Sequence, residues 1–145
     1  MKINIFIVLL SVFIVSCSND VDKLVAKQWD ECKDKENCIV DFSKIINKDW
    51  DTMYYFTNAL SFEEINSKLG FYLYKYKDVG DRIIFLKQYS TYCKIVYYKE
   101  WFPYPEMKTE EIFIDDVDGM LKVGKLNSKF KVTKQGKLYS LKLIE

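Results

Sequence analysis

Residues 1–17 restrict which part of this chain can fold as a domain. Lys2 gives a positive start, and residues 3–15 are almost wholly apolar, with only two polar interruptions. A helix needs roughly 20 apolar residues to cross the hydrocarbon core, so this run is too short for a membrane span. Its charge, length and position predict the apolar region of a secretory signal, which is removed from the mature protein. The folded domain must therefore come from the residues that follow.

The signal ends in the four residues Ile14-Val15-Ser16-Cys17. This order of an aliphatic residue, a tolerant position, a small residue and a cysteine resembles the lipobox of bacterial lipoproteins. The resemblance implies a signal peptide over residues 1–16, cleavage before Cys17, and acyl chains on the thiol and amine of Cys17. Two or more acyl chains hold a protein stably on a bilayer. An ordinary secretory signal that is cut near Cys17 is the alternative.

The same resemblance implies a location in the cell envelope, lipid-anchored to a membrane. Ser18, not aspartate, follows the cysteine, which implies the outer membrane if the cell is Gram-negative. The sequence alone does not distinguish the two membranes or their faces.

Composition narrows the classes of function that remain. Once Lys2 is removed with the signal, the remaining Lys and Arg equal the 21 Asp and Glu, and no long run carries one sign. Nucleic-acid binding needs a clustered basic surface, and phosphate binding favours arginine, of which Arg82 is the single example. The chain also has no histidine, the commonest general base and zinc ligand. We therefore expect no nucleic-acid partner, no cofactor, no metal site and no enzymatic activity.

Three cysteines remain after Cys17. Cys32 and Cys38 flank the polar loop 33–37, and outside the cytoplasm such a nearby pair is expected to form a disulfide. Two free thiols, or a different pairing with Cys93, are the alternatives. Cys93 itself lies in a strand-like run, where a cysteine is expected to behave as a small buried apolar residue.

Two helices are predicted. The apolar residues of 20–29 recur at helical spacing, which predicts a short helix after the lipidated tether; we take residues 17–31 as this tether and helix. Ser61-Phe62-Glu63-Glu64 is a capping box, and Gly70 provides the left-handed stop. The second helix, over residues 62–69, is too short to be stable alone and must pack on a sheet.

The remaining patterns are typical of strands that are rich in aromatic and β-branched residues. For residues 32–145 they predict a single α+β domain, a twisted antiparallel sheet of about six or seven strands with one short helix packed on a face. The run over residues 82–87 is apolar on both faces, as a central covered strand would be. The expected strand segments are 38–42, 50–56, 71–76, 82–87, 91–101, 111–115, 130–133 and 137–144. A turn at residues 88–90 is expected to join two of them as a hairpin, and Gly136 is expected at the turn of a final hairpin.

The segment 101–105 is the candidate binding loop. It places Trp101, Phe102 and Tyr104 around two prolines in a connection that is not a strand. Exposed aromatic rings on a rigid loop can recognise a protein or a carbohydrate. The alternative is a loop whose rings fold back over the core.

Two acidic motifs suggest other chemistry, a calcium site and glycan cleavage. The segment 115–119 fails the EF-hand spacing, because Ile114 and Lys125 would occupy the first and last ligand positions. It is therefore interpreted as an acidic turn. The pairs Glu63-Glu64 and Glu110-Glu111 could suggest glycan cleavage, but Glu64 already has a capping role and neighbouring strand residues face opposite ways.

Three short motifs lie within residues 38–100: Trp50-Asp51-x-x-Tyr54-x-Phe56, Ser61-x-Glu63-Glu64-Ile65 continuing to Leu69-Gly70, and Ile84-Phe85-Leu86. Together they resemble a set of small bacterial lipoproteins to which no activity is assigned. The resemblance implies a similar fold and carries over no functional residue.

These observations together predict a lipid-anchored cell-envelope protein that binds a ligand without catalysis. Its expected partners are the membrane, through the lipid anchor, and a protein or an envelope polymer. Two alternatives stay open at this point. One is an inhibitor or immunity lipoprotein that neutralises a lytic enzyme, and the other is a small envelope hydrolase that uses carboxylates or Cys93.

Overall fold

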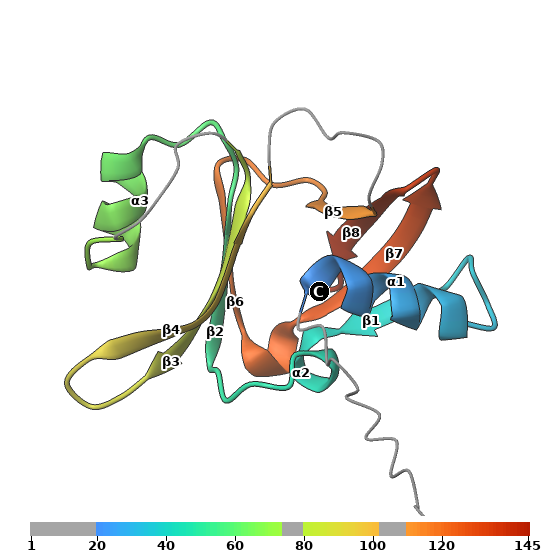
Figure 1. The fold of residues 1–145 in the computed structure, drawn as a ribbon, viewed down its shortest axis with the longest axis horizontal. Coiled ribbons are helices and arrows are strands. Elements are labelled where there is room, and N and C mark those ends of the chain that lie inside the picture. Colours follow the sequence, from blue (N-terminus) through green and yellow to red (C-terminus); the bar gives the residue numbers. More distant parts are fainter. Residues whose placement is uncertain (1–19, 74–79, 102–109) are drawn as a thin grey trace, which may run out of the picture.

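A computed structural model describes residues 20–73, 80–101 and 110–145 (Figure 1). In these ranges no helix has the length and apolar character needed to cross a membrane. The helical elements are α1 (Val21–Glu31), α2 (Phe42–Ile45), α3 (Phe62–Leu69) and the 3₁₀ turn η1 (Lys125–Asn127). The strands are β1 (Ile39–Asp41), β2 (Thr52–Phe56), β3 (Arg82–Gln88), β4 (Cys93–Glu100), β5 (Glu111–Ile114), β6 (Met120–Gly124), β7 (Lys129–Gln135) and β8 (Leu138–Leu143).

The described strands form two sheets of four strands each. Sheet I has the order β1-β7-β8-β5, and sheet II has the order β4-β3-β2-β6. Neighbouring strands are antiparallel except β5 and β8, which run parallel. The predicted α+β class is confirmed, but the prediction of one sheet with six or seven strands is wrong. A local pattern shows where a strand lies and not which strand it joins, and β2 finds a partner in β6, far along the chain.

The main core lies between the two sheets, and a smaller core lies under α3. Strand β3 contributes to both, because Ile83 and Phe85 enter the main core while Ile84 and Leu86 enter the smaller one. The prediction of a central strand covered on both faces is therefore confirmed. Each such fully buried side chain contributes about 1.5–3 kcal/mol relative to an exposed one. Figure 1 shows the resulting layers, with α3 on the outer face of sheet II.

Helix α1 lies on the inner face of sheet I. It contacts both edge strands of that sheet, β5 and β1, and its residues Val21 and Val25 are fully buried in the main core. Asp20 caps the helix by accepting a hydrogen bond from the backbone amide of Asp22 at 3.0 Å. The predicted helix over residues 20–29 is confirmed and extends to Glu31. Helix α1 therefore packs against residues of the predicted domain 32–145.

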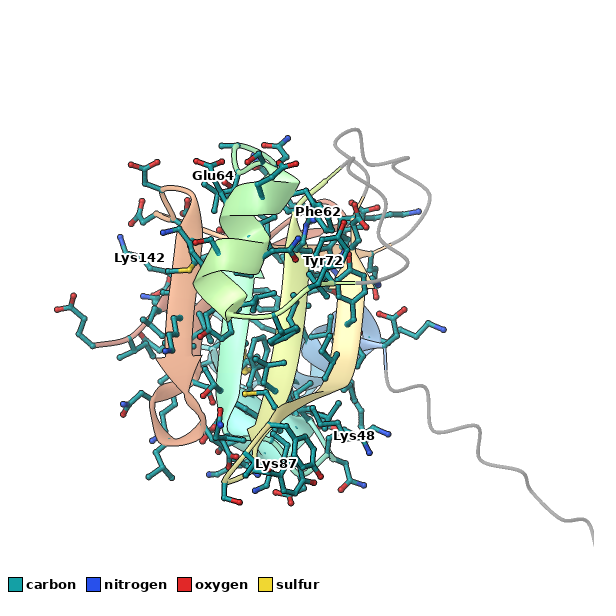
Figure 2. All side chains as sticks on the ribbon, turned by 90° about the vertical axis from the view of Figure 1, so that its left-hand side faces the viewer. Lys48, Phe62, Glu64, Tyr72, Lys87 and Lys142 are labelled. Carbon is teal, nitrogen blue, oxygen red and sulfur yellow. A yellow bond between two sulfur atoms is a disulfide. The ribbon has the colours of Figure 1, made fainter. Side chains whose placement is uncertain are left out.

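Helix α3 confirms the predicted capping box. The backbone amide of Glu64 donates to Ser61 Oγ at 3.3 Å, and the amide of Ser61 donates to Glu64 Oε2 at 2.7 Å. Gly70 ends the helix with a φ of 77°. Figure 2 shows α3 lying across sheet II, where Phe62 faces Tyr72 with ring centroids 5.1 Å apart.

The remaining predictions about elements have mixed outcomes. The two hairpins β3–β4 and β7–β8 are confirmed, the second with Gly136 at a φ of 63° in its turn. Strand β6 and helix α2 were not predicted. In the predicted strand 71–76, residues 71–73 are not part of a strand, and residues 74–76 lie outside the described residues.

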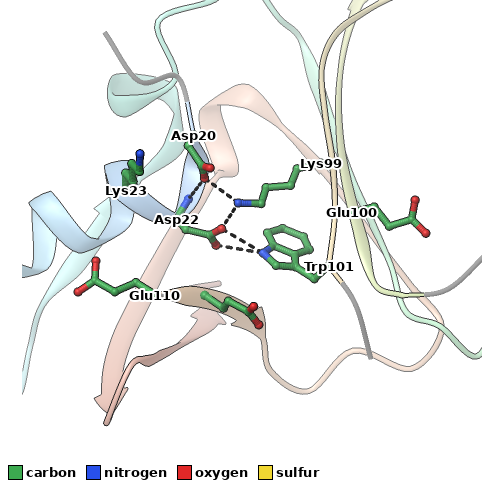
Figure 3. A pocket seen from close by; sticks show the side chains of 8 residues that line it. Asp20, Asp22, Lys23, Lys99, Glu100, Trp101 and Glu110 are labelled. Carbon is green, nitrogen blue, oxygen red and sulfur yellow. Dashed lines mark hydrogen bonds and ion pairs between the residues drawn. The ribbon is translucent and has the colours of Figure 1, made fainter. Parts of the chain in front are cut away.

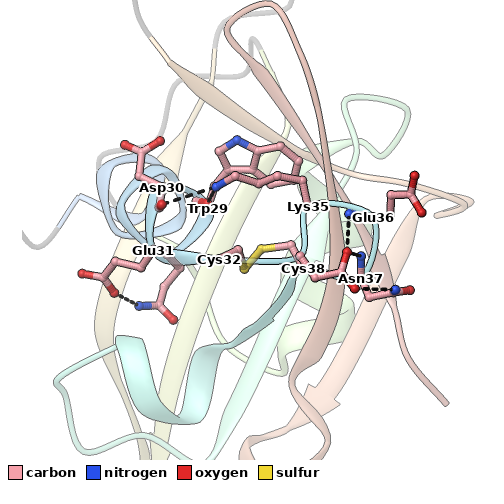
Figure 4. Close-up of a disulfide and its surroundings, with 10 residues drawn as sticks. Trp29, Asp30, Glu31, Cys32, Lys35, Glu36, Asn37 and Cys38 are labelled. Carbon is pink, nitrogen blue, oxygen red and sulfur yellow. Dashed lines mark hydrogen bonds between the residues drawn. A yellow bond between two sulfur atoms is a disulfide. The ribbon is translucent and has the colours of Figure 1, made fainter.

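The structure contains the predicted disulfide between Cys32 and Cys38, with Cα atoms 5.8 Å apart. It joins the end of α1 to the residue before β1 (Figure 4). Within the enclosed loop, the Asp34 carboxylate accepts a bond of 2.8 Å from Asn37 Nδ2 and one of 3.0 Å from the amide of Glu36. The bridge therefore fixes the direction in which the chain leaves α1.

Candidate functional site

A charged cleft of about 320 Å³ lies where α1 begins, β4 ends and β5 begins (Figure 3). Carboxylates and lysines dominate its lining, with one indole among them. We call this feature the α1 cleft; its lining residues are Asp20, Asp22, Lys23, Lys99, Glu100, Trp101, Glu110 and Glu111.

Asp22 is the hub of the α1 cleft. It is 3% exposed. It accepts hydrogen bonds from the residue that follows β4 and from the backbone of β5. Trp101 Nε1 lies 3.1 Å from each of its carboxylate oxygens, and the backbone amide of Ile112 donates at 2.8 Å. The ammonium group of Lys99 also binds this carboxylate. One side chain of α1 therefore joins β4, β5 and the residue after β4.

Lys99 connects Asp22 to the cap of α1. Its Nζ lies 2.7 Å from Asp20 Oδ1 and 5.6 Å from the centre of the Trp101 ring. Beside this pair, the amide of Val21 donates to the Tyr97 hydroxyl at 3.0 Å. The first turn of α1 is therefore held to β4 by an ion pair and by a hydrogen bond from a backbone amide to a side-chain hydroxyl.

These contacts shift the pKa values of the charged groups. Burial raises the pKa of the Asp22 carboxyl, and the hydrogen bonds from Lys99 and Trp101 only partly oppose it. Burial would also raise the pKa of Asp20, but the Lys99 ammonium outweighs it and holds that pKa below its ordinary value. Burial would lower the pKa of Lys99, yet its two carboxylate partners raise it. The cluster thus favours a charged lysine between two acidic groups.

The rim of the α1 cleft carries further carboxylates. Glu100 Oε1 lies 3.8 Å from Arg82 Nη2, and Glu110 Oε1 lies 3.8 Å from Lys134 Nζ. Burial, followed by the negative charge of Asp22, raises the pKa of Glu111. Within the part of the chain that the structure describes, no group of three or more acidic or cysteine side chains is arranged to hold a metal ion. The arrangement is suited to binding a polar group, in particular a positively charged one.

The residues of the predicted binding loop fall partly in this site. Trp101 lines the α1 cleft but is only 7% exposed and packs in the main core. Phe102 and Tyr104 lie outside the described residues, so the binding loop stays a prediction. Cys17, the predicted lipidation site, also lies outside them.

The other candidate residues lie away from the α1 cleft. Cys93 is exposed and is not in a disulfide, and its thiol donates to Gln88 Oε1 at 2.7 Å. The expectation that Cys93 is buried is therefore wrong, because the start of β4 lies at the exposed end of its hairpin. Glu64 caps α3, as predicted.

Sequence reasoning missed Asp22 and Lys99. Asp22 lies in the first turn of a helix, where an acidic residue is ordinarily explained by the helix dipole. Lys99 lies on a strand that carries several charged residues. The two residues are 77 positions apart, and no local signal connects them.

No known protein family, curated protein or solved structure matches this chain. The resemblance to bacterial lipoproteins stays a prediction.

Proposed function

We propose that this chain is a lipid-anchored cell-envelope protein whose domain binds a ligand without catalysis. The observation that carries the proposal is the short apolar leader that ends in Ser16-Cys17. The disulfide between Cys32 and Cys38 supports it, because such bonds persist in oxidising compartments outside the cytoplasm.

The contacts of Asp22 favour a structural role over a catalytic one for this residue. A general acid or base must be able to exchange a proton with a substrate. Asp22 is instead enclosed by donors from Lys99, Trp101 and Ile112. A carboxylate in this setting stabilises the domain and shapes the cleft. The exposed rim, with Lys23 on α1 and Glu110 immediately before β5, is available to a protein or an envelope polymer that lies at the membrane surface.

The anchor is tested with Cys17→Ala in a bacterium that processes lipoproteins. The wild-type chain should fractionate with membranes and show an acylated N-terminal peptide by mass spectrometry. Cys17→Ala should lose the acyl chains and leave the membrane fraction. Cys93→Ser is the matched control and should behave as wild type. A Cys17→Ala protein that still fractionates with membranes would remove the anchor model.

The binding role is tested by photo-crosslinking in intact cells. A photoreactive amino acid replaces Lys23 at the α1 cleft or, as a control, Lys142 on the outer face of sheet I. We expect a discrete crosslinked partner from position 23 and not from position 142. A lytic enzyme as that partner would indicate the inhibitor role. Substrate turnover by the purified wild-type domain that Asp22→Asn or Cys93→Ser abolishes would contradict a role without catalysis.

A further inference from the structure

The described part of the domain begins close in sequence to the proposed lipidation site at Cys17. Asp20 is the first described residue, and only three residue steps separate it from Cys17. A fully extended chain covers at most about 3.6 Å for each residue, so these steps span at most about 11 Å.

The start of α1 does not readily release more chain. Asp20 is bound to Lys99, and the amide of Val21 is bound to the Tyr97 hydroxyl. Unwinding the first turn would break these contacts and expose Val21, which is fully buried. That exposure alone would cost about 1.5–3 kcal/mol. The link to the bilayer therefore stays short.

The short link restricts the orientation of the domain, because the domain is larger than the span of the link. A compact chain of this length has a radius of gyration of roughly 14 Å, which exceeds the span of the link. A domain attached at one surface point by a link shorter than its own radius cannot turn that point away from the membrane.

We infer that the rim of the α1 cleft lies against the lipid headgroups while the outer face of sheet I points away from them. This inference rests on the proposed lipid anchor at Cys17. Lys142 marks the far face, because Leu141 beside it is buried in the core that holds α1 while Lys142 is exposed. In Figure 2, Lys142 and α1 (blue) lie at opposite sides of the view.

The charge of the α1 cleft determines which headgroups suit it. Its lining contains five carboxylates and two lysines. Arg82 and Lys134 pair with Glu100 and Glu110 from outside the lining, which leaves one negative charge in excess. Headgroups lie within a Debye length of about 8–10 Å when the rim touches the bilayer, so this excess of negative charge is not fully screened. The rim of the α1 cleft should therefore accept zwitterionic headgroups, whose ammonium groups can approach Glu110 and Glu111. Anionic lipids should repel it.

The orientation is tested with the mature chain, residues 17–145, carrying Cys93→Ser and coupled through the Cys17 thiol to a maleimide lipid in phosphatidylcholine vesicles. A fluorescent amino acid replaces Lys23 or Lys142, and a headgroup-labelled nitroxide lipid quenches it. From the short link and the domain radius, we expect quenching at position 23 to exceed that at position 142 by roughly threefold or more. Equal quenching at the two positions would overturn the inference.

A longer link tests whether the length of the link sets the orientation. A Gly/Ser insert of roughly 20 residues between Ser18 and Asn19 has a mean span of about 25 Å, which lets the domain turn. Quenching at position 23 should then fall toward that at position 142, and an unchanged difference would show that the link does not set the orientation. Because the lipid is attached chemically, these results do not depend on natural acylation, which the Cys17→Ala fractionation tests separately.

A change of lipid charge tests the preference of the rim for zwitterionic headgroups. Replacing half of the phosphatidylcholine by phosphatidylglycerol should reduce quenching at position 23 at low salt, and Glu110→Gln with Glu111→Gln should weaken this effect. Quenching that rises with phosphatidylglycerol, or is indifferent to it at low salt, would overturn the assignment of zwitterionic headgroups.

Discussion

The indole of Trp101 donates to both carboxylate oxygens of Asp22, over 3.1 Å each, across 79 positions of the chain. The same carboxylate binds Lys99 and the amide of Ile112. The cleft at the start of α1 is thus built around one buried acid that joins the helix to strands β4 and β5. This acid is the residue whose removal should matter most for the shape of the candidate site.

We expect Asp22→Ala to destabilise the domain by about 3 kcal/mol or more, because it leaves the Lys99 charge partly buried without this carboxylate partner. Asp22→Asn, which keeps the shape and loses the charge, should cost less. Urea unfolding followed by tryptophan fluorescence measures both. Lys27→Ala is the control on the same helix; its pair with Glu31 is exposed, so its loss should cost only about 0.3–0.5 kcal/mol. Equal losses from Asp22→Ala and Lys27→Ala would show that Asp22 is not the hub.

Stability should fall as the pH rises above about 10. Tyr55 is fully buried, and burial, together with its bond of 2.6 Å to Asp81, raises the pKa of its hydroxyl above the ordinary 10.0. The unfolded chain then loses this proton at a lower pH than the folded chain. The Tyr55 hydroxyl therefore makes its full contribution to the free energy of unfolding below its pKa in the unfolded chain. This contribution is lost as the pH rises toward the pKa of the hydroxyl in the folded chain. The raised pKa of Lys99 acts with the same sign from about 10.5 upward.

Thermal unfolding over a pH series checks this alkaline loss. Tyr55→Phe should make the decline above pH 10 less steep, because the ionising hydroxyl is gone. Tyr72→Phe, at a position that is 59% exposed, should leave the decline as it is in wild type. A Tyr55→Phe profile parallel to that of wild type would contradict the assignment.

The cap of α3 should be measurable on its own. Ser61→Ala removes the hydroxyl that accepts from the amide of Glu64, and such a loss costs about 1 kcal/mol. Ser67→Ala changes the same residue type on the exposed side of α3 and should stay within about 0.5 kcal/mol of wild type. Chemical denaturation distinguishes the two, and indistinguishable midpoints would mean that the cap contributes nothing.

Removing the disulfide should lower stability without changing the fold. On the chain-entropy model, so short a loop contributes about 2–3 kcal/mol. The double variant Cys32→Ser with Cys38→Ser should therefore unfold at lower urea and become insensitive to reducing agent. Cys93→Ser, which leaves the bridge intact, should retain both the wild-type midpoint and the response to reducing agent.

The features that the sequence predicted correctly depend on neighbours along the chain. The capping box of α3 needs only Ser61 and Glu64, and the β7–β8 hairpin turns at Gly136 between two strand patterns. The disulfide closes over a loop of a few residues between Cys32 and Cys38. In each case the interacting residues are close enough in sequence for their spacing to specify the contact.

Tertiary structure alone decided the rest. The division into two sheets depends on β2 pairing with β6, and the parallel pairing of β5 with β8 places Ile112 beside Tyr139. The α1 cleft exists only because Asp22, Lys99 and Trp101 meet across long stretches of chain. Spacing in the sequence encodes the local geometry of a helix, a turn or a strand. The partner of a strand or of a buried charge is chosen by which packing of the whole chain buries the most apolar surface and pairs its polar groups.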